Sequence, residues 1–246
     1  MLEKVDLTKK ISKEEYKAKM PQMEIELGRL QRECRELKIP VMIVFEGFGA
    51  SGKGVQIGKL IQSMDPRGFQ VFPVKAETEE ERMHPFLWRF WTKTPEAGRI
   101  AIFDGSWYRK VLIDRFEKRT REKEIETAFH SIEAFEKQLT DGGTILVKLL
   151  LDIDQKEQKK RFEKLLEKKE TAWRVSQGDR ERNAKYSEYA AMMEEVLYRS
   201  DTKSAPWTVI EATDRRFATV KIYMTVIHAL AEAVEAVQRR RMEEQA

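Results

Sequence analysis

A glycine-studded stretch near residue 50 has the residue types and spacing of a phosphate-binding loop. Residues 47–53 read G-F-G-A-S-G-K, which matches the pattern G-x-x-x-x-G-K. An apolar run at 41–45 precedes this stretch, and an amphipathic pattern follows it. Glycines let backbone N–H groups turn inward around phosphate oxygens, the start of a helix adds a favourable field, and a lysine neutralises the outer phosphates. The candidate phosphate-binding residues are therefore Gly47, Gly49, Ser51, Gly52, Lys53 and Gly54.

The alternative interpretation is a plain strand-to-helix turn that happens to contain glycines. Gly54 raises a separate question, because most such loops have Ser or Thr there to bind Mg²⁺. Without that hydroxyl, a metal ion needs other ligands, and carboxylates at strand ends are the obvious source. Asp104 closes a predicted strand over 99–104 and is the candidate metal ligand. A strand-terminal Asp can instead cap a helix, and this second role stays open.

Alternating apolar runs and amphipathic patterns define the elements that must position these residues. The runs predict strands at 41–45, 69–75, 99–104, 144–152 and 205–212. Helices are predicted around 23–37, 52–64 and 217–237, and a short one at 84–91. A longer helix ends before Gly142, and its apolar face carries Ile125, Phe129, Ile132 and Leu139. Residues 155–200 are helical and highly charged, and Asp154 with Glu157 suggests a capping box. This alternation predicts a parallel sheet covered on both faces, with ligands at the carboxyl ends of its strands.

Composition limits the class of protein. The chain has 246 residues, of which 36% are charged, with a formal net charge of +4. This basic excess is compatible with nucleic acid, an acidic membrane or a phosphate-bearing substrate, and no nucleic-acid recognition motif is present. Cys34, the only cysteine, excludes an internal disulfide and a thiolate metal cluster. The first residues lack an apolar signal region and no run approaches about 18 apolar residues, so we expect a cytoplasmic protein without a membrane partner.

Two basic runs and one aromatic cluster have competing interpretations. Arg115 lies two helical turns beyond Tyr108 and shares its face, so we expect it to point toward the site as a charge neutraliser. The lysines and arginines of 156–185 form either a solvated helix face or a phosphate-binding surface. Aromatic residues at 86–91 either stack on a nucleotide base or belong to the core, and the core is the commoner outcome. The three histidines have no ligand spacing.

Four stretches together resemble the polyphosphate kinase 2 family. They are FEGFGASGKG at 45–54, HPFLWRFW at 84–91, IAIFDGSWYRKVLIDRF at 100–116 and APWTVIEATD at 205–214, in the family's order and at similar spacing. The resemblance implies a P-loop kinase-like three-layer α/β sandwich, with a five-stranded parallel sheet, helices on both faces and a helical lid. It implies one domain over 1–246, in which 1–39 is a helical extension and about 155–200 forms the lid and associated helices.

The family also implies the chemistry of the site. Its members move the terminal phosphoryl group between inorganic polyphosphate and a nucleotide, and their loops end G-K-G, as this one does. Mg²⁺, with Mn²⁺ as a second candidate, is held by a loop Asp and by the residue that corresponds to Asp104. The lid contacts polyphosphate, and the pair Trp173-Arg174 resembles its motif, so Arg174 is a candidate phosphate ligand. The resemblance also implies a homo-oligomer.

The sequence departs from the family pattern at two positions. The family loop reads G-x-D-x-x-G-K-G, but residue 49 is Gly here. The family motif D-R-S-W-Y is replaced by D-G-S-W-Y, with Gly105 at the position of the arginine. One metal carboxylate and one phosphate-binding arginine are therefore missing.

The functional prediction is a phosphotransferase that uses polyphosphate and AMP or ADP, with Lys53, Asp104 and Arg115 as catalytic residues. The alternative is a catalytically degenerate family member that binds polyphosphate or nucleotide in a regulatory or assembly role. An ordinary ATP-dependent nucleotide kinase is a third possibility, which the missing metal hydroxyl disfavours.

Overall fold

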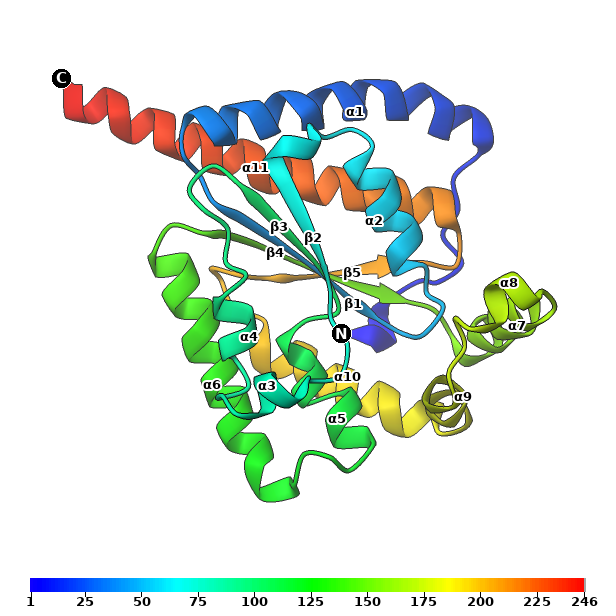
Figure 1. The fold of residues 1–246 in the computed structure, drawn as a ribbon. Coiled ribbons are helices and arrows are strands. Elements are labelled where there is room, and N and C mark those ends of the chain that lie inside the picture. The colour runs from blue at the N-terminus through cyan, green and yellow to red at the C-terminus, as the bar shows by residue number, and fades with distance from the viewer. Residues whose placement is uncertain (246) are drawn as a thin grey trace.

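The computed structural model describes residues 1–245 and is built around one parallel β-sheet (Figure 1). Five strands lie in the order β2-β3-β1-β4-β5. Every residue of the central strand β1 is buried, because β1 is a continuous apolar run covered on both faces. The predicted α/β fold with a five-stranded parallel sheet is therefore confirmed. The strands are β1 (Val41–Gly47), β2 (Phe69–Pro73), β3 (Ile100–Asp104), β4 (Ile145–Asp152) and β5 (Trp207–Glu211).

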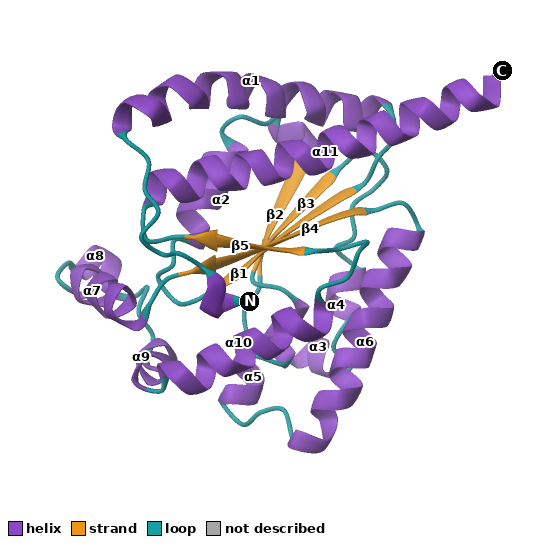
Figure 2. Ribbon diagram, turned by 180° about the vertical axis from the view of Figure 1, so that it is seen from behind, coloured by secondary structure: helices purple, strands orange, loops and turns teal. Residues whose placement is uncertain are grey.

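Helices cover both faces of this sheet (Figures 1 and 2). On one face lie α1 (Lys13–Glu36), α2 (Lys53–Ile61) and α11 (Arg215–Gln245). On the other lie α3 (Glu79–Arg82), α4 (Trp88–Trp91), α5 (Ile113–Phe116), α6 (Glu122–Asp141) and α10 (Tyr186–Ser200). A third group projects beyond the carboxyl ends of the strands, and it consists of α7 (Gln155–Leu166), α8 (Lys169–Ala172) and α9 (Gln177–Ala184).

Helix boundaries differ from the prediction in two instructive ways. Helix α1 begins at Lys13, well before the predicted start, because Ser12 and Glu15 form a capping box there. Asp154 caps α7 by accepting from the Glu157 N–H, but the Glu157 side chain binds Arg161 instead of closing a box. An i,i+4 ion pair within α7 thus uses the side chain that the capping box needs.

The long helix α11 is apolar over much of its length. It is the one helix among residues 1–245 that could cross a membrane by length and composition, and half of its apolar window is buried inside the protein. The helix packs along α1 and against β4 and β5. The buried half of its apolar window therefore belongs to the core between the sheet and α1.

A buried polar network holds the turn that follows β3. Trp107 and Tyr108 are fully buried and both donate to Oε1 of Glu136 on α6, at 2.9 and 2.5 Å. The other carboxylate oxygen, Oε2, pairs with Lys148 Nζ at 2.7 Å, and Lys148 also donates to the Ser200 carbonyl at 2.6 Å. Burial lowers the pKa of Lys148, and Glu136 offsets part of that shift. The S-W-Y residues are thus core anchors that fix the chain just beyond Asp104.

We expect Glu136→Leu to lower the free energy of unfolding by about 3–5 kcal/mol, because it leaves the Lys148 ammonium buried without its counter-charge. Urea unfolding followed by circular dichroism would measure the loss. Lys137→Ala, an exposed change on the same helix, should cost under about 0.5 kcal/mol. A loss from Glu136→Leu no larger than that of the control would show that the network is energetically neutral.

Candidate functional site

The loop between β1 and α2 has the backbone shape of an anion nest. Gly47 has φ +138°, and a Cβ there would lie 2.3 Å from the Leu151 carbonyl oxygen, so only glycine fits. Ala50 and Gly52 also have positive φ, +57° and +107°. For Ala50 this conformation is strained and must be held by its surroundings. Such alternation of left- and right-handed residues directs successive N–H groups toward one point.

Several N–H groups of this loop are unpaired. The Ser51 N–H donates to the Phe48 carbonyl at 3.1 Å, whereas six neighbouring groups have no protein acceptor within residues 1–245. Three of them open helix α2, where the field of the helix also favours an anion. The six N–H groups belong to Gly49, Ala50, Gly52, Lys53, Gly54 and Val55.

Charged side chains of opposite sign meet beside this nest. Lys53 Nζ lies back on the loop and donates to the carbonyls of Gly47 and Phe48, at 3.0 and 3.4 Å. Asp104 reaches to 4.0 Å from where a Gly54 Cβ would be, and its carboxylate has no hydrogen bond or ion pair to any described residue. Register explains its position, because Asp104 pairs with Phe45 at the end of the parallel strands. The structure thus brings Lys53 and Asp104 to one place, as the sequence predicted.

Glu46 is a site carboxylate that the sequence analysis missed. It is 6% exposed, and its Oε1 accepts from the Ser106 hydroxyl at 2.7 Å. Burial raises the pKa of this carboxyl, Lys53 lowers it and Asp104 raises it further. Glu46 follows an apolar run immediately before the loop, and a lone charge at the end of a buried strand is a sequence signal that could have identified it.

Other candidates have different surroundings. Ser51 Oγ is buried and has no hydrogen-bond partner among residues 1–245, while the Ser51 N–H and carbonyl are bound by Phe48 and Arg161. Arg115 donates to Glu195 at 2.5 Å and lies 3.6 Å from Glu122, and its charge is therefore shared with α10 and α6. Arg174 is exposed on the α8–α9 segment and lies over the Trp173 ring. Neither arginine contacts the loop, and their roles stay predictions.

The aromatic cluster at 86–91 divides between core and surface. Phe90 is buried and packs on Phe103 and Trp107. Trp91 packs edge-on against Phe135, while Trp88 stacks on His84 at 4.0 Å. The core interpretation therefore holds for Phe90.

Gly49 is packed against the projecting helices. A Cβ at this position would lie 2.9 Å from Asp179 Oδ1 and 3.2 Å from Phe162 Cζ. Asp179 itself is fixed, since Arg182 donates to Oδ1 at 2.8 Å and the Ser176 hydroxyl donates to Oδ2 at 2.6 Å. A carboxylate of α9 thus occupies the space into which a residue-49 side chain would extend.

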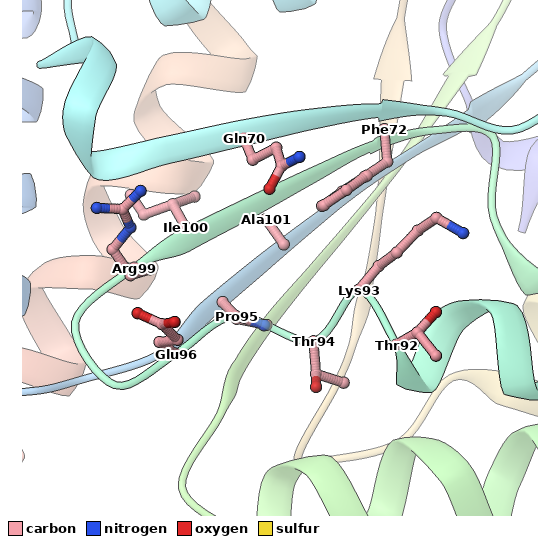
Figure 3. A pocket seen from close by; sticks show the side chains of 10 residues that line it. All are labelled: Gln70, Phe72, Thr92, Lys93, Thr94, Pro95, Glu96, Arg99, Ile100 and Ala101. Atoms are coloured by element: carbon pink, nitrogen blue, oxygen red, sulfur yellow. The ribbon is translucent and has the colours of Figure 1, made fainter.

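Two hollows lie away from this site. One, of about 180 Å³, lies between the 92–96 loop and the amino-terminal parts of β2 and β3 (Figure 3). The second, of about 790 Å³, is lined by the segment before β1, the start of β4 and α11. Both are at the end of the sheet opposite the loop, so neither belongs to the candidate site.

Asp152, at the carboxyl end of β4, is a buried carboxyl whose pKa burial raises to about 6, with Asp154 and Glu211 adding to the shift. Since the folded pKa is above the unfolded value of about 3.9, stability falls as pH rises from about 4 to 6.

We expect Asp152→Asn to be more stable than wild type by about 2–3 kcal/mol at pH 7.5 and equal to it near pH 3.5. Urea unfolding at both pH values checks this, and a pH-independent difference would refute it.

We expect Gly49→Asp to destabilise the protein by about 1–3 kcal/mol, because the new side chain meets the Asp179 carboxylate. Asp179→Ala should recover part of this loss in the double variant, so that the two changes are not additive. Gly58→Asp is the matched control, since a Cβ at Gly58 meets nothing within 4 Å. Additive costs in the urea-unfolding cycle would mean that residues 49 and 179 do not interact.

Comparison with known proteins places this geometry in a family. The model of the family described as Polyphosphate kinase 2 (PPK2) matches residues 10–239. A polyphosphate:AMP phosphotransferase of Pseudomonas syringae pv. tomato is 36% identical over 233 residues, which cover 95% of this chain and 47% of that protein. An NDP-polyphosphate phosphotransferase 3 of Ruegeria pomeroyi is 31% identical, over 88% of this chain and 72% of that protein.

A solved structure shows the same architecture. The polyphosphate kinase 2 of Arthrobacter aurescens TC1 superposes with a TM-score of 0.88 at 30% identity, covering 94% of this chain and 85% of that one. The present chain nevertheless spans about half the length of the first curated relatives that it matches. With the family model matched over nearly the whole sequence, the chain belongs to the polyphosphate kinase 2 family.

Proposed function

We propose that this chain is a phosphotransferase that moves a phosphoryl group between inorganic polyphosphate and AMP or ADP. One observation carries the proposal: six unpaired N–H groups surround Lys53, and the unpartnered Asp104 carboxylate lies beside them. Unpaired donors at the start of a helix form an anion site, and the free carboxylate adds a ligand for a cation that accompanies phosphate. We treat residues 1–246 as one domain, with the projecting helices of 155–200 as its lid.

The residues present fit a divalent cation held jointly with substrate. No group of three or more His, Cys, Asp or Glu within residues 1–245 could form a cage for a metal ion. Mg²⁺ usually takes one or two carboxylates and completes its octahedron with waters and phosphate oxygens. Asp104 would hold Mg²⁺ or Mn²⁺, with Glu46 as the nearby second carboxylate. The ion would supply neutralisation of phosphate charge, a role that polyphosphate makes essential.

The remaining chemistry is done by residues of the chain. The N–H groups of the loop and Lys53 bind the terminal phosphoryl oxygens of polyphosphate and orient its phosphorus. A phosphate oxygen of the acceptor nucleotide attacks that phosphorus in line, and the bond to the next phosphate of the chain breaks. AMP becomes ADP while polyphosphate loses one unit, with no covalent enzyme intermediate. Arg115 and Arg174 are the further cations proposed to neutralise charge, which for Arg115 requires exchange of its Glu195 partner.

The names of two relatives support this choice of substrates, since they specify polyphosphate with AMP or with nucleoside diphosphates. Location in the cytoplasm and assembly into a homo-oligomer remain predictions.

A second candidate function is polyphosphate or nucleotide binding without catalysis. Two observations favour it: position 49 is filled by Asp179 of α9, and Gly105 has φ +74°, a conformation that suits glycine better than the arginine of the family motif. Retention of both Lys53 and Asp104 favours catalysis. An ATP-dependent kinase would be recognised by activity with ATP and none with polyphosphate.

We expect Lys53→Ala and Asp104→Asn each to lower kcat for nucleotide formation by about 10²–10³-fold, because each removes a charge that faces the transferred group. The assay contains AMP or ADP, polyphosphate and Mg²⁺ or Mn²⁺, with nucleotides separated by chromatography. Lys59→Ala is the matched control, since Lys59 lies on the same helix but bonds Tyr16 and Thr219.

Wild-type turnover that persists in Lys53→Ala would rule out the assignment of that lysine. No turnover by wild type, together with Lys53-dependent binding of polyphosphate, would establish the binding function instead.

A further inference from the structure

We infer that Arg161 is a positioning residue of the phosphate loop, which holds the loop in its binding shape from behind without touching the substrate. Arg161 belongs to the basic run of 156–185, in which its neighbours Lys159 and Lys160 are exposed. Arg161 itself is only 7% exposed. The inference rests on the proposed function, because it concerns how the same loop binds phosphate.

The guanidinium of Arg161 uses all five of its N–H donors on the protein. Nη1 donates to the carbonyls of Ala50 and Ser51, at 3.1 and 3.0 Å. Nη2 donates to the carbonyls of Ala212 and Thr213, at 2.8 and 3.0 Å. Nε donates to Glu157 Oε1 at 2.7 Å. No donor is left for a phosphate, so Arg161 differs in kind from a substrate-binding arginine.

Its contacts fix the orientation of peptide groups in the nest. In a planar trans peptide the carbonyl and the following N–H point in opposite directions. Arg161 therefore turns the N–H of Gly52 toward the nest when it binds the Ser51 carbonyl. Gln158, on the same helix, binds the Gly49 carbonyl at 3.0 Å and acts in the same way on the N–H of Ala50. Together they support the strained positive φ of Ala50.

The same side chain ties the loop to a distant segment. Ala212 and Thr213 connect β5 to α11, so one planar group joins this connection to the phosphate loop. Lysine cannot replace this function, because an ammonium presents its donors from one point whereas the guanidinium fork spans four carbonyls. The ion pair with Glu157 balances the charge of Arg161, and its role is therefore geometric more than electrostatic.

Arg161→Lys is the test, because it keeps the charge and removes the fork. We expect the Kd for tripolyphosphate, measured by calorimetry, and the KM for polyphosphate to rise roughly 10- to 100-fold, as misplacement of a binding group by about 1 Å predicts. The KM for nucleotide should change less than about twofold, and guanidinium ion should restore tripolyphosphate binding to Arg161→Gly. Lys137→Ala, which removes an exposed charge from α6, away from the projecting helices, is the control and should bind as wild type does.

Amide NMR relaxation provides a readout that needs no ligand. The order parameters of the Ala50 and Gly52 amides should fall in Arg161→Lys and stay unchanged in Lys137→Ala. Arg161→Gln serves if the lysine variant does not fold. Wild-type order parameters and affinity in a folded Arg161 variant would overturn the inference. Failure of wild type to bind tripolyphosphate would instead count against the proposed function, with the relaxation data still deciding the role of Arg161.

Discussion

A loop that binds phosphate must keep backbone N–H groups without protein acceptors while every other polar group around them is satisfied. Unpaired N–H groups are costly when buried, so they must face an opening where water or a ligand can reach them. Here the carbonyls on the other side of the same peptides are bound by Gln158 and Arg161. Phe48 stacks on Tyr186 at 4.8 Å and fixes the beginning of the loop. The projecting helices and α10 thus determine the shape of a loop that is far from them in sequence.

The sheet supplies the second part of the site. Parallel strands end at one edge, and the register of β1 with β3 brings Asp104 next to the last residues before the loop. The chain beyond Asp104 is held by the buried network of Glu136 and Lys148, to which Trp107 and Tyr108 donate. Those aromatic residues therefore act on the site through position only. The carboxylates of Asp104 and Glu46 are kept beside Lys53 by core packing on both sides of the sheet.

Some charged residues of the projecting helices form ion pairs within the protein, and others face solvent. Arg182 pairs with Glu117 at the end of α5, which ties α9 to that helix, and with Asp179 of its own helix. Arg161 pairs with Glu157 of its own helix. Arg174 and most of the lysines of α7 are exposed. The glycine at residue 49 belongs to the same region, since it lets Asp179 pack against the loop.

The sequence alone predicted the strands and most of the helices, and it selected Lys53 and Asp104 as the candidate site pair. Apolar runs without polar interruption specify buried parallel strands, and the G-x-x-x-x-G-K spacing before a helix specifies an anion loop, because both depend on neighbours in the chain. Lys53 and Asp104 could be selected for that reason. The burial of Glu46 and the pairing of Arg115 with α10 depend on contacts between distant segments. Only the tertiary structure decided which cations of this basic run face solvent. Arg161 and the exposed Lys159 and Lys160 are consecutive in the sequence, and their exposure differs because of what packs against each of them.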